Sequence, residues 1–184
     1  RTSVREAIQG LATAGFIERR GNRAFVVEIV PGLELVLDSR KATVRNLFEV
    51  RRVIEPAMAG LVALRAPEHV RREIADLASR HADGIDEFRL IDRQFHQMIA
   101  SACDNPVLSE VYSKALASLF NSEEFASLLY AENNKEEVSN IVESSSHAHI
   151  EIAEALLAGD QVRTEKAVAA HLCDVEARML ERLV

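Results

Sequence analysis

The residues of this chain best suited to bind a cation are one aspartate and three histidines: Asp92, His96, His149 and His171. Asp92 and His96 are four residues apart, so on a helix they lie one turn apart on the same face. His149 and His171 each fall on the apolar stripe of another expected helix. Carboxylate oxygen and imidazole nitrogen are ligands that divalent transition metals accept readily. The pattern predicts a metal site where three helices meet, with zinc as the best-suited ion and nickel or manganese as alternatives.

A single inward-facing histidine is more often a hydrogen-bonded core residue than a metal ligand. Four polar groups buried without a shared partner would cost about 1–3 kcal/mol for each unsatisfied group. A bound cation removes that cost, which is why the combination favours a metal site. His147 is excluded, because it precedes His149 by two residues and is rotated from it by about 200° on a helix.

Arg51 is a charged residue on an otherwise apolar helical face. It follows Leu47 by four residues and Phe48 by three, within a helix expected from residue 43 to 66. A charge in that position is costly unless it is paired. Two partners fit: an acidic neighbour such as Glu55, or the carboxylate of a small ligand held by two parallel hydrogen bonds. We predict that Arg51 binds an effector, and pairing with Glu55 stays open as the alternative.

The elements that would position these residues are helical, so the expected fold class is all-α. The chain has 184 residues, 48% of them hydrophobic and none of them Trp, so Leu, Ile, Val and Ala must form the core. Apolar residues recur at three- and four-residue steps from residue 43 onward, without a strand pattern after residue 30. Expected helices cover residues 43–66, 67–81, 86–103, 106–120, 136–158 and 162–183, and residues 122–134 are less regular. Pro56 predicts a kink or a break in the first of them.

The first 30 residues differ from the rest in charge and pattern. Residues 1–27 carry five arginines and two acidic residues, a net charge of +3, whereas the remainder carries 17 basic and 27 acidic residues, a net charge of −10. A helix to about Ala14 and two short strands, 16–20 and 24–28, are expected around a turn at residues 21–23. A helix followed by a basic hairpin is how a winged helix-turn-helix ends. We therefore expect the end of a DNA-binding domain at 1–30, a linker at 31–42 and a helical metal- and ligand-binding domain at 43–184.

Hydroxyl and guanidinium groups at the start of a helix suit contacts to double-stranded DNA. Arginine can bind guanine with two hydrogen bonds, and serine or threonine can bind phosphate. The predicted DNA-binding residues are Arg1, Thr2, Ser3, Arg5, Arg19, Arg20, Asn22 and Arg23. The alternative is that these arginines form only the solvated face of a small helical cap.

Two groups of motifs resemble one known family. Residues 1–8 and 11–17 resemble the recognition helix and following strand of the GntR family of bacterial transcription regulators. The remaining motifs resemble the FCD effector-binding domain of the FadR subfamily; they are residues 47–56, 92–96, 105–108, 159–160 and 170–172, together with His149.

The resemblance implies an antiparallel helical bundle that binds a metal through the Asp92, His96, His149 and His171 positions. A small organic acid would complete the metal coordination, with Arg51 helping to hold its carboxylate. It also implies a homodimer that binds a palindromic operator and responds to the acid. The resemblance thus implies a regulator and not an enzyme.

Other features restrict the setting. Cys103 and Cys173 are far apart and lack CxxC spacing, which favours a reducing cytosol and hence a cytoplasmic protein. No apolar run approaches the roughly 18 residues of a membrane helix, and no signal peptide opens the chain. The chain does not begin with Met, so we expect an N-terminal piece to precede it. Two rival functions stay open: a metal-dependent enzyme acting on a small organic acid, and a helical interaction module stabilised by its metal.

Overall fold

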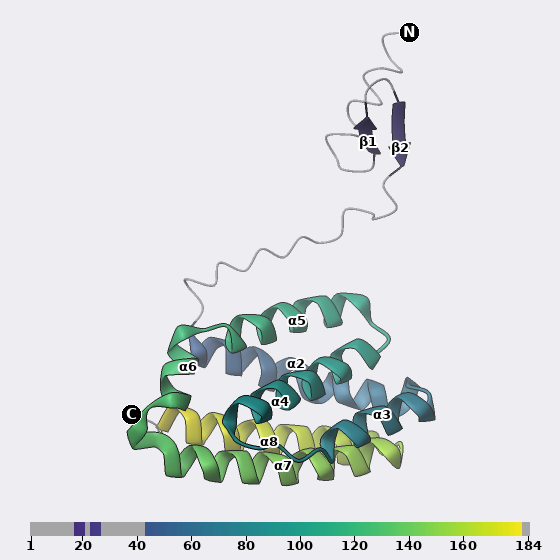
Figure 1. The fold of residues 1–184 in the computed structure, drawn as a ribbon. Coiled ribbons are helices and arrows are strands. Elements are labelled where there is room, and N and C mark those ends of the chain that lie inside the picture. Colours follow the sequence, from purple (N-terminus) through teal and green to yellow (C-terminus); the bar gives the residue numbers. More distant parts are fainter. Residues whose placement is uncertain (1–16, 21–22, 27–42, 182–184) are drawn as a thin grey trace. The chain divides into compact units, whose positions relative to one another are not determined.

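The computed structural model describes residues 17–20, 23–26 and 43–181, and the chain divides into two units, Arg1–Val36 and Leu37–Val184. Figure 1 shows the described helices of the second unit in blue to yellow. Their order is α2 (Val44–Arg65), α3 (Glu68–Ala78), α4 (Ile85–Ala102), α5 (Pro106–Phe120), α6 (Glu123–Tyr130), the 3-10 turn η1 (Glu132–Asn134), α7 (Lys135–Leu157) and α8 (Gln161–Glu181). The described part of this unit contains no strand, so the predicted all-helical domain is confirmed.

The described part of the first unit is a hairpin of β1 (Ile17–Arg20) and β2 (Arg23–Val26). The strands are antiparallel, and Arg20 lies opposite Arg23 in the register. The expected strands are thus found within two residues at each end. The helix expected before them, with Arg1, Thr2, Ser3 and Arg5, lies outside the described residues, as does Asn22.

Several of the described helices begin where the sequence supplies a capping side chain. Thr43 accepts a hydrogen bond from the Asn46 amide and its own amide is bonded by the Asn46 side chain, a capping box that begins α2. Asn105 caps α5, with Pro106 at the first helical position. Asp160 accepts a hydrogen bond from the Arg163 amide at the start of α8. These caps set the rotation with which each helix enters the core.

Pro56 does not divide the first long helix, so that half of the expectation is wrong. Helix α2 runs unbroken from Val44 to Arg65. Proline removes one backbone hydrogen bond from a helix interior. Here α2 packs along its length against α4, α5, α7 and α8, and this packing outweighs the local loss.

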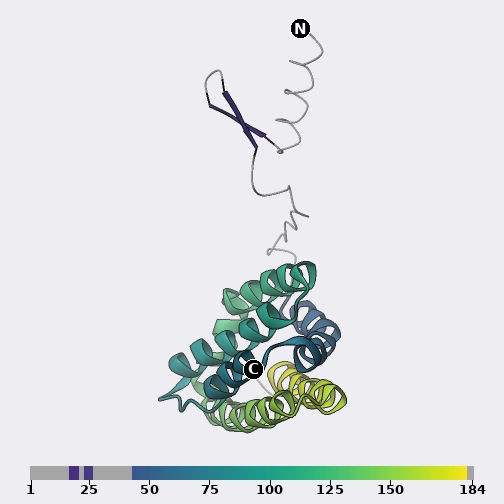
Figure 2. The same cartoon turned by 90° about the vertical axis from the view of Figure 1, so that its right-hand side faces the viewer.

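Helices α2, α7 and α8 pack together, and α4 and α5 cover them. Helix α2 contacts α8 and α5, and α7 contacts α8 and α3. In Figure 1, α5 lies along the top of the helical unit and α7 and α8 along the bottom, and Figure 2 shows the same layers turned by 90°. Fully buried apolar side chains fill the space between them, among them Phe48, Met58, Phe95, Leu116 and Leu172. Several polar side chains are buried in the same core, and they form the site described next.

None of the helices in the described ranges combines the length and the apolar character that a membrane crossing requires.

Candidate metal and ligand site

The four predicted metal ligands converge on one point inside the helical unit. Asp92 and His96 lie on α4, His149 on α7 and His171 on α8, and one ligand atom from each lies within 4.8 Å of the other three. Atoms bound to a single zinc ion about 2 Å away lie within about 4 Å of one another. A small inward shift would therefore bring all four to bonding distance. We call these four residues the His–Asp cluster.

Two buried imidazole nitrogens of the cluster face the same carboxylate without forming a hydrogen bond. The Nε2 atoms of His96 and His149 each lie 3.3 Å from Oδ1 of Asp92. Neither nitrogen has a hydrogen-bond partner in the described ranges. The two rings are 0% and 2% exposed, so water does not compensate. Buried polar atoms normally find partners, and two orphaned nitrogens facing one carboxylate fit a cation between them.

The electrostatics keep two of the imidazoles neutral. Burial lowers the pKa of His149 even though Asp92 acts in the opposite direction. Burial also lowers the pKa of His171 well below its usual value, and the neighbouring imidazoles of His149 and His96 act in the same direction. Burial by itself would raise the pKa of Asp92, but the nearby His96 and His149 hold it well below its usual value. A neutral imidazole offers a lone pair and an ionised carboxylate offers a charge, as a metal site requires.

Aromatic rings fix the position of His149. The Phe95 ring stacks on it with 4.3 Å between centroids, and the Phe88 ring lies nearly parallel to it at 6.4 Å. Both phenylalanines come from α4, the helix that also carries Asp92 and His96. Packing against these two rings of α4 thus helps to hold the His149 ring beside Asp92 and His96.

Glu55 forms a second layer around the cluster. Its side chain is fully buried on α2 and accepts hydrogen bonds from Nδ1 of His96 and from the Tyr112 hydroxyl. Burial acts to raise the pKa of Glu55, but His96 and Arg51 outweigh it and lower the pKa to about 2. Burial acts to lower the pKa of His96, but the Glu55 carboxylate outweighs it and raises the pKa, while holding a proton on Nδ1. In the neutral form that metal binding requires, Nε2 is then the ring nitrogen that faces the cluster with a lone pair.

Sequence reasoning named Glu55 only as a partner for Arg51 and did not identify its contact with His96. The available signal was its place on the apolar stripe one turn after Arg51. Tyr112, which lies on α5, carried no signal.

Arg51 forms the internal pair that the sequence offered as one alternative, and its role in effector binding stays a prediction. Its Nε donates to Oε2 of Glu55 at 3.2 Å, so the predicted internal pairing is confirmed. Its Nη2 is buried and has no hydrogen-bond partner in the described part of the chain. Burial acts to lower the pKa of Arg51, but electrostatic interactions with Tyr112 and Glu55 raise it above the usual value, so the group stays charged. One face of the guanidinium therefore remains free for an anion.

A small cavity of about 30 Å³ lies beside the cluster, lined by residues from α2, α4, α5, α6, α7 and α8. Its polar lining is Arg51, Arg89, Asp92, Ser145 and His171, and its other lining residues are apolar. The free face of Arg51 and two cluster residues thus border the same space. A ligand in this cavity would reach both the metal position and the guanidinium.

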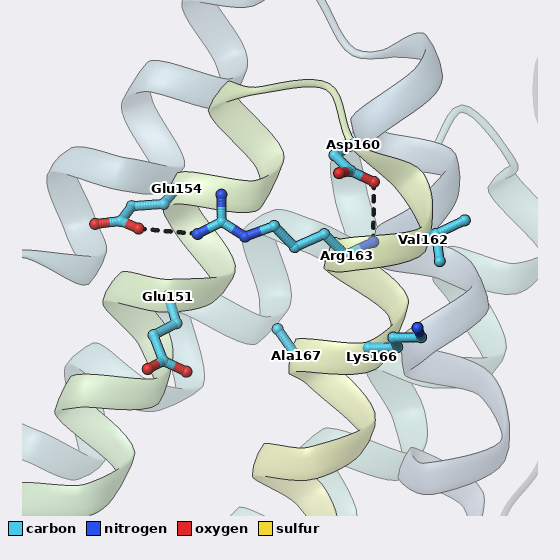
Figure 3. A pocket seen from close by; sticks show the side chains of 7 residues that line it. All are labelled: Glu151, Glu154, Asp160, Val162, Arg163, Lys166 and Ala167. Carbon is cyan, nitrogen blue, oxygen red and sulfur yellow. Dashed lines mark hydrogen bonds and ion pairs between the residues drawn. The ribbon is translucent and has the colours of Figure 1, made fainter.

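A second depression lies on the surface where α7 meets α8. Figure 3 shows Glu151, Glu154, Asp160, Arg163 and Lys166 around it. Arg163 pairs with Glu154 at 3.0 Å, and the Asp160 carboxylate caps α8. Its charged groups are exposed and partly paired with one another, unlike the buried polar atoms of the His–Asp cluster.

Comparison with known proteins places the chain in a family. The model of the FCD domain matches residues 46–174, a range that contains Arg51 and the whole His–Asp cluster. The HTH-type transcriptional regulator LutR of Bacillus subtilis (strain 168) is 27% identical over 186 residues, which covers 96% of this chain and 83% of LutR.

Two solved structures share the fold. Streptococcus agalactiae GntR is 23% identical with a TM-score of 0.58, and the match covers 95% of this chain and 80% of that one. Lar, which controls the expression of the Listeria monocytogenes agr system and mediates virulence, is 14% identical with a TM-score of 0.59 over 99% of this chain and 80% of its own. The chain therefore belongs to the FCD-domain family, and it is similar to the transcriptional regulator LutR.

Proposed function

We propose that this regulator senses a small carboxylic acid through a divalent transition metal held by the His–Asp cluster, with zinc as the best-suited ion. Arg51 binds the carboxylate of the acid, and the acid changes the affinity of a homodimer for its operator DNA. The FCD domain and the similarity to the transcriptional regulator LutR support a regulator and not an enzyme, as the sequence predicts. Its placement in the FadR subfamily and in the cytoplasm stays a prediction.

The observation that carries the proposal is a set of buried nitrogens without hydrogen bonds at and beside the His–Asp cluster. Nε2 of His96, Nε2 of His149 and Nη2 of Arg51 are all buried without hydrogen-bond partners in the described residues. The two imidazole nitrogens suit a cation, and the guanidinium nitrogen suits an anion. When bound, a divalent metal supplies a positive centre that accepts a carboxylate oxygen as a further ligand.

Because the cavity is small, an acid can bind in it only if the surrounding side chains move. About 30 Å³ is room for little more than a water molecule, so an organic acid must displace side chains to enter. These side chains belong to six helices, and an acid bound among them favours the arrangement with the wider cavity. Ligands shift such an equilibrium by their differential affinity for the two arrangements. Operator affinity changes if the two arrangements also differ in the spacing of the DNA-binding units of the dimer.

DNA contact is assigned to the basic N-terminal region. The predicted contact residues are Arg1, Thr2, Ser3 and Arg5 before the hairpin and Arg19, Arg20, Asn22 and Arg23 in or beside it. The backbone register that sets Arg20 opposite Arg23 brings two arginines to one end of the hairpin, next to the connecting residues. Such a pair suits the wing of a winged helix-turn-helix, which contacts the phosphate backbone.

The metal assignment is tested with two histidines that are close in sequence but differ in position. His149 faces the cluster, whereas His147 is exposed on the same helix with Nδ1 against the Glu143 carbonyl. Elemental analysis of the purified chain should find one divalent ion per chain in the wild type and in His147→Ala, and almost none in His149→Ala. An unchanged metal content in His149→Ala would refute the assignment.

A further inference from the structure

The cavity beside the His–Asp cluster is lined by a few polar residues and a larger number of apolar ones. The polar lining residues are Arg51, Arg89, Asp92, Ser145 and His171. The apolar body includes Phe48, Phe88, Phe125, Ile141, Val175 and Met179. Since the proposed function assigns metal and guanidinium to one carboxylate, the rest of the ligand would meet carbon atoms.

Arg89 is the other cation on the cavity wall, and most of its hydrogen-bonding capacity is used. Its Nη2 donates to the Phe120 carbonyl and its Nη1 to the Tyr130 hydroxyl, each at 3.0 Å. Its guanidinium carbon also lies 5.8 Å from the centre of the Phe125 ring. Only Nε lacks a hydrogen-bond partner in the described residues. A single nitrogen cannot form the two parallel hydrogen bonds with which arginine binds a carboxylate most strongly.

We propose that the effector is a monocarboxylic acid with a compact apolar side chain, not a sugar acid and not a di- or tricarboxylate. This inference rests on the proposed function and adds the chemical class of its ligand. Each methylene group buried against the apolar body tightens binding about fourfold. A hydroxyl or second carboxylate placed there loses its water without gaining a partner, which weakens binding about tenfold or more.

The cavity walls also set the size of the acid. The closed cavity holds about 30 Å³, so the side chains must rotate to admit the ligand. Met179 and Leu129 line it, and an unbranched thioether such as Met179 can repack around differently shaped ligands. Phenylalanines on α2, α4, α5 and α6 surround the remainder, which favours a branched or singly aromatic side chain over a long one.

The proposed chemical class of the effector is tested by calorimetric titration of acids into the full chain loaded with zinc. The apolar series is acetate, butanoate, 3-methylbutanoate and 3-phenylpropanoate, and the polar series is succinate, citrate and gluconate. We expect affinity to rise about fourfold per methylene from acetate to 3-methylbutanoate. We also expect each polar acid to bind at least tenfold more weakly than 3-methylbutanoate.

The outcomes separate the two proposals. If succinate, citrate or gluconate binds most tightly, the proposal of an apolar monocarboxylic acid is wrong and the proposed function still stands. For succinate or citrate, Arg89 would then bind a second carboxylate. No binding of any acid to the zinc-loaded chain would overturn the proposed function and this inference with it.

An isosteric pair of variants gives an independent check. Val175→Thr places a hydroxyl in the cavity lining without changing the size of the side chain, and Val142→Thr does the same from α7. Val162, on the same helix as Val175, is 59% exposed and lies outside this cavity, so Val162→Thr is the matched control. We expect either lining variant to lower the affinity for 3-methylbutanoate at least fivefold and to leave the acetate affinity and the zinc content unchanged. Equal affinity for 3-methylbutanoate in all three variants would contradict the proposal.

Discussion

At the scale of single residues, Glu55 connects the two halves of the site. Its carboxylate contacts the metal-facing His96 through one oxygen and Arg51 and Tyr112 through the other. A shift of Arg51 toward an incoming anion therefore also changes the forces on a metal ligand. In the proposed function, this contact would link the effector directly to the metal.

The contact between Glu55 and His96 is tested by Glu55→Gln, which keeps the shape and removes the charge. The amide is a weaker acceptor for the Nδ1 proton, so His96 loses the group that orients it. We expect the zinc affinity, measured by competition with a chelator, to fall about tenfold to a hundredfold. Glu49→Gln is the control, because Glu49 is exposed on the same helix. Wild-type zinc affinity in Glu55→Gln would show that His96 needs no orienting partner.

The effector role of Arg51 is tested against its neighbour Arg52. Arg51 is 3% exposed beside the cavity, whereas the Arg52 side chain is 47% exposed and pairs with Glu176 on α8. We expect Arg51→Ala to retain its zinc and to lose at least tenfold in acid affinity, since a charged hydrogen bond is removed. Arg52→Ala should resemble the wild type in both measurements. Parallel loss of zinc and acid binding in Arg51→Ala would mean that the residue only supports the metal site.

At the scale of elements, the helix caps determine how the site residues are presented. Asn105 begins α5, whose Tyr112 reaches Glu55, and its side chain accepts hydrogen bonds from the Val107 and Leu108 amides at 3.2 and 3.1 Å. Gly159, with φ of 67°, ends α7 just before Asp160 caps α8. These short signals fix where two long helices stop and start, and thereby which faces meet.

Removal of the α5 cap should cost stability in a predictable amount. We expect Asn105→Ala to lower the free energy of unfolding in urea by about 1 kcal/mol, because two amides at the helix start lose their acceptor. Asn105→Ser keeps a capping oxygen and should stay within a few tenths of a kcal/mol of the wild type. If the alanine and serine variants unfold at the same urea concentration, the cap contributes nothing to α5.

At the scale of the whole molecule, a shared metal would couple helices that are distant in the chain. The cluster draws ligands from α4, α7 and α8, and Glu55 adds α2. An ion that binds the folded chain but not the unfolded chain stabilises the folded state by mass action. At free zinc one hundred times the dissociation constant, the gain is about 2.7 kcal/mol.

Thermal unfolding distinguishes a sensor from a helical module with a structural metal. We expect a chelator to lower the midpoint temperature of unfolding and zinc to restore it. The acid 3-methylbutanoate should raise this temperature further only when zinc is present. The acid should add nothing in Arg51→Ala. A midpoint that responds to zinc but to none of the acids tested would support the structural module instead.

The sequence by itself determined which residues face inward. Helical periodicity placed Asp92 and His96 on one face, selected His149 over His147 and put Arg51 on an apolar stripe, because side-chain direction on a helix follows from spacing alone. Cap residues such as Asn105 fixed the helix starts for the same local reason.

Only the tertiary structure decided which inward faces meet, and at what distance. The contacts of Glu55 with His96 and Tyr112 join α2 to α4 and α5, across separations of 41 and 57 residues. The unbroken helix through Pro56 and the free face of Arg51 also depend on neighbours from other helices. Such contacts arise from the packing of whole helices against one another, which no local pattern in the chain specifies.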